Sequence, residues 1–164
     1  RRDVIAHDPS YCKLADALYA LGRYGQKSNR GCYLYEGRER KDDPEVVALA
    51  EQIAGELGIQ RRAISDQEIH DRCVLMLVNE GIQLLDEGIA QRSSDIDLVW
   101  INGYGFPAWR GGPLHYAEGL GLAQVLERIS HYRQALGAYG AMWFQPAALL
   151  ERLVASGKTR VERI

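Results

Sequence analysis

Long apolar runs are missing from this sequence of 164 residues. No stretch comes near the ~18 apolar residues that a membrane-spanning helix needs, and the first residues show no signal-peptide pattern. Charge of one sign is not in excess either, because 20 Lys and Arg stand against 22 Asp and Glu. A near-neutral chain with mixed charges carries no electrostatic footprint for nucleic acid or a membrane surface. We therefore expect a soluble protein with no nucleic-acid partner and no membrane span.

Cysteine and proline are scarce, with 3 Cys and 5 Pro. Cys12, Cys32 and Cys73 are odd in number, far apart and outside any Cys-x-x-Cys pair, which indicates a reducing compartment. The hydrophobic share of 46% is typical of a globular chain that folds without disulfides or metals. The sequence opens on Arg1-Arg2 rather than Met, and we expect it to be a piece of a longer protein.

Motifs for metal binding and hydrolysis are also absent. The histidines His7, His70, His115 and His131 stand alone, without the spacing of a metal site, and there is no G-x-S-x-G or H-E-x-x-H. We expect no metal site, and no self-contained active site in this chain.

Helical patterns dominate what is present. Capping residues, apolar periodicity and terminal glycines predict successive helices that end near Gly22, that run over 43–58, 65–90 and 94–103, and that follow over 113–119, 121–136 and 146–156. The third of these contains an apolar stretch at 74–78, so it should be the central, most buried helix. Asn79 and Glu80 follow it, and we interpret them as a hydrogen-bonded polar pair at a helix contact rather than as catalytic groups. No strand pairs are predicted.

The stretch LVWINGYGFPA, residues 98–108, contains the sequence pattern G-x-G-x-x-A, which is typical of a dinucleotide-binding turn. That site requires a strand before the turn, whereas Ser94-Asp95-Ile96-Asp97 has the form of a helix capping box. Pro107 also removes a backbone N–H from the turn that would hold the phosphates. We therefore predict a helix that ends at Asn102-Gly103, with Trp100 buried against the core.

The stretch Gly22-Arg23-Tyr24-Gly25-Gln26-Lys27-Ser28 resembles a phosphate-binding P-loop in composition only. Its spacing differs and no strand leads into it, so its glycines are expected to serve tight turns. A contact between phosphate and Arg23 or Lys27 is the alternative hypothesis for this loop.

Several motifs together resemble the carboxy-terminal region of 3-hydroxyacyl-CoA dehydrogenases, above all the multifunctional fatty-acid oxidation enzymes that also carry an enoyl-CoA hydratase domain. In chain order they are the glycine-rich loop of residues 22–33, Val78-Asn79-Glu80-Gly81, Asp95-Ile96-Asp97, Asn102-Gly103-Tyr104-Gly105-Phe106-Pro107 and Trp109-Arg110-Gly111-Gly112-Pro113. The loop departs from the family pattern at Asn29, where glycine or lysine is common, and at Cys32, where Phe or Tyr is usual. The likeness covers nearly the whole chain from Tyr11 to Gly157.

This resemblance implies an all-α fold of the 6-phosphogluconate dehydrogenase C-terminal-like type, with one full helical repeat and the tail of a preceding one. Residues 1–40 would be the tail of the first repeat with its glycine-rich loop, and residues 41–164 the second repeat. The family's catalytic Asn lies in a V-N-R stretch of the first repeat, and its His, Glu and Ser lie in the dinucleotide-binding domain. When His70-Asp71-Arg72 is laid over V-N-R, Asp71 stands where that Asn would be.

The implied role is structural, in a parent enzyme that oxidises 3-hydroxyacyl-CoA to 3-ketoacyl-CoA with NAD. The NAD cofactor, the NAD-binding domain, the first repeat and the acyl-CoA substrate belong to the parent, and this piece is expected to have no catalytic or cofactor-binding residue of its own. Arg23 and Lys27 are candidates for a CoA phosphate contact, and a thiolase subunit is a candidate partner. The expected location is cytoplasmic, or the peroxisomal or mitochondrial matrix in a eukaryote. The alternatives are a stand-alone CoA-binding module and a complete helical protein-interaction domain.

Overall fold

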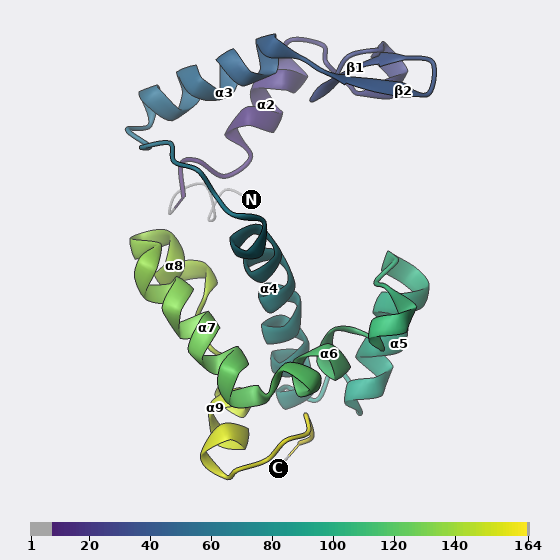
Figure 1. The fold of residues 1–164 in the computed structure, drawn as a ribbon, viewed down its shortest axis with the longest axis vertical. Helices are drawn as coiled ribbons and strands as arrows, with labels where there is room; N and C mark the ends of the chain where they lie inside the picture. The colour runs from purple at the N-terminus through teal and green to yellow at the C-terminus, as the bar shows by residue number, and fades with distance from the viewer. Residues whose placement is uncertain (1–7, 164) are drawn as a thin grey trace. The chain divides into compact units, whose positions relative to one another are not determined.

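A computed structural model describes residues 8–163 of the chain (Figure 1). The chain divides into two compact units, one ending at Ala63 and the other beginning at Ile64. The predicted boundary between the two repeats, at residues 40 and 41, comes from the family resemblance, whereas the two units are defined by contacts. The repeat boundary therefore stays a prediction.

The first unit pairs two helices and adds a small hairpin. Its elements are α2 (Lys13–Ala20), the 3-10 turn η1 (Gln26–Ser28), β1 (Tyr33–Glu36), β2 (Glu39–Asp42) and α3 (Pro44–Glu56). The strands are antiparallel, with Tyr33 opposite Asp42 and Glu36 opposite Glu39. The prediction of no strand pairs is therefore wrong in this detail, because the aromatic run after the glycine-rich loop pairs with the charged residues that follow it.

Capping explains where two helices begin. The carboxylate of Asp43 accepts a hydrogen bond from the amide of Glu45 ahead of Pro44, as the sequence predicts for α3. The hydroxyl of Ser65 accepts a hydrogen bond of 3.2 Å from the amide of Glu68 and caps the longest helix, α4. The predicted start of the central helix is confirmed.

The second unit is built entirely of helices in the part that the structure describes. Its elements are α4 (Asp66–Asp86), α5 (Ser93–Tyr104), the 3-10 turn η2 (Ala108–Arg110), α6 (Pro113–Leu120), α7 (Leu122–Ala135), α8 (Gly137–Trp143) and α9 (Ala148–Ala155). Helix α8 was not predicted, because the sequence offers no cap or apolar periodicity strong enough to separate it from α7. The prediction that α4 extends to Ala90 is also wrong, since it ends at Asp86 and Gly88 turns the chain with a φ of 75°.

The core of the second unit surrounds α4. Helices α6, α7 and α9 all contact α4, and α7 contacts α9 as well. Side chains less than 2% exposed come from each of these helices, together with Phe144: Leu75, Val78, Ile82, Leu85, Leu114, Val125, Ile129, Leu149, Leu150 and Leu153. The prediction that α4 is the central, most buried helix agrees with this packing.

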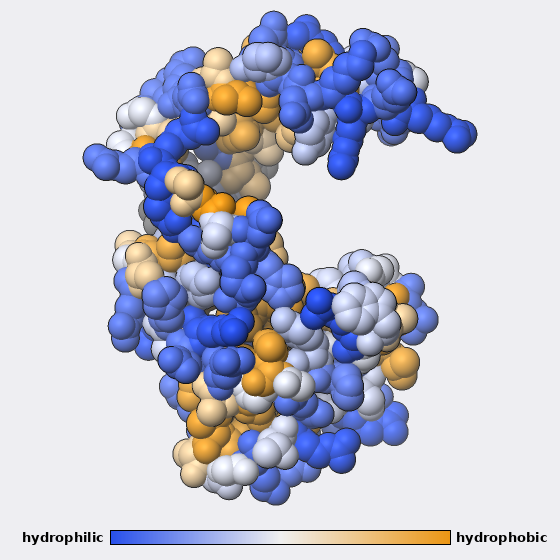
Figure 2. Space-filling model, viewed as in Figure 1, coloured by the Kyte–Doolittle hydropathy of each residue, from blue (hydrophilic) through white to orange (hydrophobic). Residues whose placement is uncertain are grey.

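On the face that Figure 2 shows, most residues are hydrophilic and hydrophobic residues lie among them. None of the helices within residues 8–163 combines the length and the apolar character required to cross a lipid bilayer.

Candidate functional site

The glycine-rich loop of the first unit is organised by Arg23. Its guanidinium, with a side chain only 6% exposed, forms an ion pair with Asp43 and donates a hydrogen bond of 3.1 Å to Glu45. Its Nε also donates to the carbonyl of Gly31 at 3.1 Å. The guanidinium beside Asp43 is the main cause that lowers the pKa of that carboxyl. Arg23 therefore joins the loop to the start of α3.

Lys27 has a different position in the same loop. It lies in η1, its side chain is exposed, and no ion pair joins it to another residue of the described chain. The structure thus accounts for Arg23 by contacts within the chain and leaves Lys27 open to solvent. The predicted contact of both residues with a CoA phosphate stays a prediction.

Asp71 occupies the first half of α4 and is nearly buried, with a side chain 8% exposed. It accepts hydrogen bonds from Gln67 at 2.7 Å, from Arg128 at 3.3 Å and from the hydroxyl of Tyr132 at 3.4 Å. Two of these partners lie on α7, so the carboxylate links α4 to α7. Its lone pairs are already taken by donors of its own chain.

Asn79 joins α4 to the segment that precedes α9. Its Nδ2 donates to the carbonyl of Gln145 at 2.7 Å, and its Oδ1 accepts from the amide of Ala147 at 2.8 Å. Glu80 is exposed and takes no part in this contact. Asn79 is therefore a structural residue of a helix contact, as the sequence indicates, whereas the pairing with Glu80 is wrong.

The stretch LVWINGYGFPA forms the end of α5 and the turn after it. Residues 98–104 are helical, and Gly105 ends the helix with a φ of 75°. The strand that a dinucleotide-binding turn requires is therefore replaced by helix, which agrees with the sequence interpretation. Two details differ, because the helix ends after Tyr104 rather than at Asn102-Gly103, and Trp100 is only partly buried against the core.

The capping box expected of Ser94 and Asp97 is also wrong. Helix α5 starts earlier, where Asp95 accepts a hydrogen bond of 3.1 Å from the amide of Arg92. Asp97 points to another helix and accepts hydrogen bonds from the amides of Leu114 at 2.7 Å and His115 at 3.2 Å. Burial raises the pKa of Asp97 in spite of these two hydrogen bonds.

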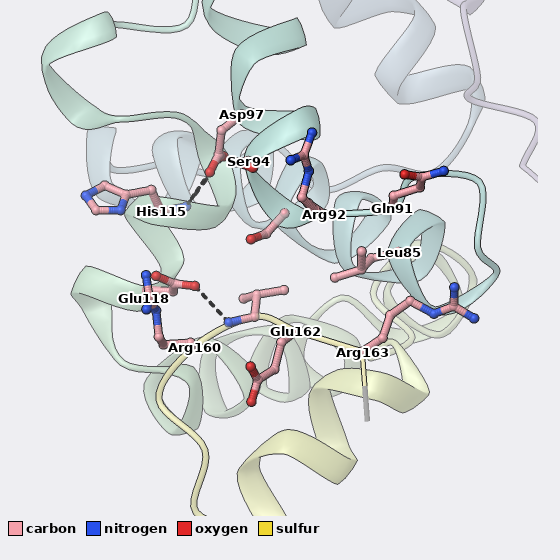
Figure 3. A pocket seen from close by; sticks show the side chains of 12 residues that line it. Leu85, Gln91, Arg92, Ser94, Asp97, His115, Glu118, Arg160, Glu162 and Arg163 are labelled. Carbon is pink, nitrogen blue, oxygen red and sulfur yellow. Dashed lines mark hydrogen bonds between the residues drawn. The ribbon is translucent and has the colours of Figure 1, made fainter.

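Figure 3 shows a pocket next to this contact, at the start of α5. Arg92, the residue before α5, lines it together with Ser94 and Asp97 of α5, and His115 and Glu118 line it from α6. The C-terminal segment of residues 160–163 closes the remaining side.

Histidines do not gather at any of these places. His70, His115 and His131 lie on α4, α6 and α7, and the residues that the structure describes contain no group of three side chains able to hold a metal ion. His7 lies outside the described residues.

Comparison with known proteins identifies relatives along most of the chain. The family model described as the 3-hydroxyacyl-CoA dehydrogenase, C-terminal domain, matches residues 69–163. The peroxisomal bifunctional enzyme of Danio rerio is 42% identical over 156 residues, which are 93% of this chain and 21% of that protein. The fatty acid oxidation complex subunit alpha of Pseudomonas syringae pv. tomato is 34% identical over 88% of this chain and 19% of that protein. The chain thus spans about one fifth of the length of these relatives.

A solved structure shows the same fold. The dehydrogenase part of multifunctional enzyme 1 from C. elegans superposes with a TM-score of 0.58 at 24% identity, over 85% of this chain and 32% of that chain.

Proposed function

Given that the chain belongs to the family of 3-hydroxyacyl-CoA dehydrogenase C-terminal domains, we propose that it is the non-catalytic, helical scaffold of such an enzyme. The parent enzyme would oxidise 3-hydroxyacyl-CoA to 3-ketoacyl-CoA with NAD in fatty-acid β-oxidation, and would carry an enoyl-CoA hydratase domain as well. Its NAD-binding domain and first helical repeat would be the immediate partners of this chain. A thiolase subunit is a further candidate partner.

The main support for this proposal is the set of contacts that the side chain of Asp71 makes. The resemblance aligns Asp71 with the catalytic Asn of the first repeat, but the side chain of Asp71 has no N–H donor, unlike the amide of Asn. Arg128 and Tyr132 bind this carboxylate from α7. The position is therefore used for packing two helices together, which supports a structural role.

The end of α5 does not have the features of a site for the dinucleotide NAD. The single stretch that spells a dinucleotide-binding turn is the end of α5, and Pro107 in that turn lacks a backbone N–H. Binding of NAD by the parent would therefore fall to a domain other than this one. The peroxisomal names of several relatives suggest a peroxisomal location for the parent, with the mitochondrial matrix and the cytoplasm as the other candidates.

A kinetic measurement tests the non-catalytic role. The chain is mixed with acetoacetyl-CoA and NADH, and the loss of NADH absorbance is followed. We expect no turnover from the wild type, and none from Asp71→Asn, which restores the amide but not the other catalytic groups. Turnover above the protein-free rate in either sample contradicts the proposal. The reading frame upstream of Arg1 tests the parent, since we expect it to encode a G-x-G-x-x-G strand-turn-helix.

Contact of the glycine-rich loop with CoA phosphates is a separate proposal, and the exposure of Lys27 supports it. Calorimetry of CoA against the wild type and Lys27→Ala tests it, with Lys13→Ala as the matched control because Lys13 is also exposed in the first unit. Equal heats for all three proteins contradict the contact. Arg23→Ala is unsuitable as the first variant, because it also removes the contacts that join the loop to α3.

A further inference from the structure

Helix α5 lies at the edge of the second unit, where it packs mainly against α6 and α4 (Figure 1). Several large apolar side chains on α5 and in the turn before it are more than half exposed: Ile89, Leu98, Val99 and Tyr104. Contiguous exposed apolar patches are uncommon on soluble monomers and mark sites of interaction. This surface, which we name the α5 face, is therefore a candidate docking surface.

An apolar groove with a volume of about 390 Å³ is the main feature of the α5 face. Asp95 is the one carboxylate in its lining, and it pairs with Arg92 at 3.0 Å, so the groove has no unpaired charge. The groove therefore suits apolar side chains better than a charged ligand. Its apolar lining comes from α4, the turn after α4, and α5: Leu84, Ile89, Ala90, Ile96, Val99 and Trp100.

Leu98 provides an apolar projection next to this groove. Its side chain is 57% exposed and lies outside the groove, whereas its neighbour Val99 is part of the lining. A surface that has both a groove and a projection can bind a copy of itself, because a two-fold axis pairs each feature with the other one. Leu98 of each copy would then enter the groove of the other, as ridges enter grooves when helices pack.

The charges at the two ends of α5 are complementary as well. Arg92 precedes the helix, and its side chain is 75% exposed. The last turn of α5 contains no basic residue, although the carbonyl groups at the end of a helix carry a partial negative charge. When two copies of α5 lie antiparallel, Arg92 of each copy lies toward the carbonyl end of the other. The α5 face thus matches a second copy of itself in shape and in charge.

We propose that the α5 face binds a second copy of this chain in a two-fold symmetric dimer, with Leu98 of each protomer in the groove of the other. The surface lies wholly within the second unit. The dimer is independent of the dehydrogenase activity proposed for the parent, because no residue of the α5 face is assigned to that reaction.

Sedimentation equilibrium of the whole chain over a range of concentrations tests the proposal. We expect the mass of the wild type to rise with concentration from 18.4 kDa toward twice that value. Leu98→Glu and Val99→Lys each place a charge in the apolar interface, so each should raise the dissociation constant of the dimer at least about tenfold. The matched control is Ile69→Glu, because Ile69 on α4 is exposed to a similar degree, 51%, and lies outside the groove.

A mixture of the two variants separates loss of docking from loss of folding. In a dimer of Leu98→Glu with Val99→Lys, the new acidic side chain faces the new basic one, and the other half of the interface keeps the wild-type Leu98 and Val99. The mixture should therefore associate more tightly than either variant alone. The proposal is overturned by a wild type that stays monomeric, which would leave the α5 face to another domain of the parent. It is also overturned by equal losses in Leu98→Glu and Ile69→Glu, or by a mixture that associates no better than its components.

Discussion

The carboxylate of Asp97, on α5, accepts a hydrogen bond of 2.7 Å from the amide of Leu114 in the first turn of α6. One helix thereby supplies the N-terminal cap of the next, which has no cap from the residue before it, Gly112. A Cβ atom on Gly112 would collide with the side chain of Asp97, so the glycine is what allows the carboxylate to approach. The motifs Asp95-Ile96-Asp97 and Gly111-Gly112-Pro113 therefore meet in one structural contact.

Asp97→Ala should lower the free energy of unfolding by about 1–3 kcal/mol, because the amides of Leu114 and His115 lose their acceptor in a buried place. Urea denaturation followed by circular dichroism measures the change. Asn102→Ala on the same helix is the control, since Asn102 is exposed and contacts only the carbonyl of Leu98. Equal losses in the two variants contradict the capping role.

Stability should depend on the protonation of Asp97. Burial raises its pKa above the ordinary 3.8, so the folded state binds the proton more tightly than the unfolded state does. The stability that protonation contributes is complete below pH 3.8 and is lost as the pH rises through the raised pKa. Unfolding free energies of the wild type and Asp97→Asn, measured across this range, should differ by an amount that falls with rising pH.

Asp43 provides a contrast of opposite sign. The guanidinium of Arg23 lowers its pKa below 3.8, so its contribution is present above pH 3.8 and is lost as the pH falls through the lowered value. In Asp43→Asn the loss of stability relative to the wild type should therefore shrink as the pH falls. If the two variants show the same trend with pH, one of the two assignments is wrong.

Local signals in the sequence were sufficient for most of the helices. Helix starts are marked by Asp43, Pro44 and Ser65, because the hydrogen bonds and backbone restrictions of these residues act within a few positions. In the structure all three stand at the starts of α3 and α4, as predicted. The hairpin over residues 33–42 was not predicted, because β2 is fully exposed and shows no alternation of apolar and polar residues.

Contacts between distant residues could not be predicted in the same way. Asp71 and Arg128 are 57 positions apart, and nothing in either segment indicates that α7 returns to α4 at this point. The sequence pattern predicts that Asp97 caps its own helix, because a cap within four residues is a common arrangement, whereas its partner Leu114 lies 17 positions further along the chain. The resemblance to a known family predicts the helical fold, whereas the hydrogen-bond partners of Asp71 and Asp97 are known only from the structure.

Asn79→Ala should lower the free energy of unfolding by about 2–4 kcal/mol, since it leaves both the amide of Ala147 and the carbonyl of Gln145 without a partner. Thermal and urea unfolding of the variant measure this loss. Gln83→Ala is the matched control on α4, because Gln83 is exposed and contacts only Glu87, and a change within about 0.5 kcal/mol is expected there. A loss in Asn79→Ala no greater than in the control contradicts the role of Asn79.

Two helical glycines of the second unit should respond to alanine in opposite directions. At Gly81 on α4, a Cβ atom would lie 3.1 Å from Leu114 Cδ2 and 3.4 Å from Ile96 Cγ2, so Gly81→Ala should destabilise the fold by roughly 1–2 kcal/mol through overpacking. At Gly103 on α5, a Cβ atom would meet nothing within 4 Å, so Gly103→Ala should stabilise the fold by about 0.5–1 kcal/mol through helix propensity. Urea denaturation of both variants under one set of conditions gives the comparison. Leu114 is buried and lies close to Gly81, so an added methyl group has no free space there. Equal stability of Gly81→Ala and Gly103→Ala would contradict the prediction.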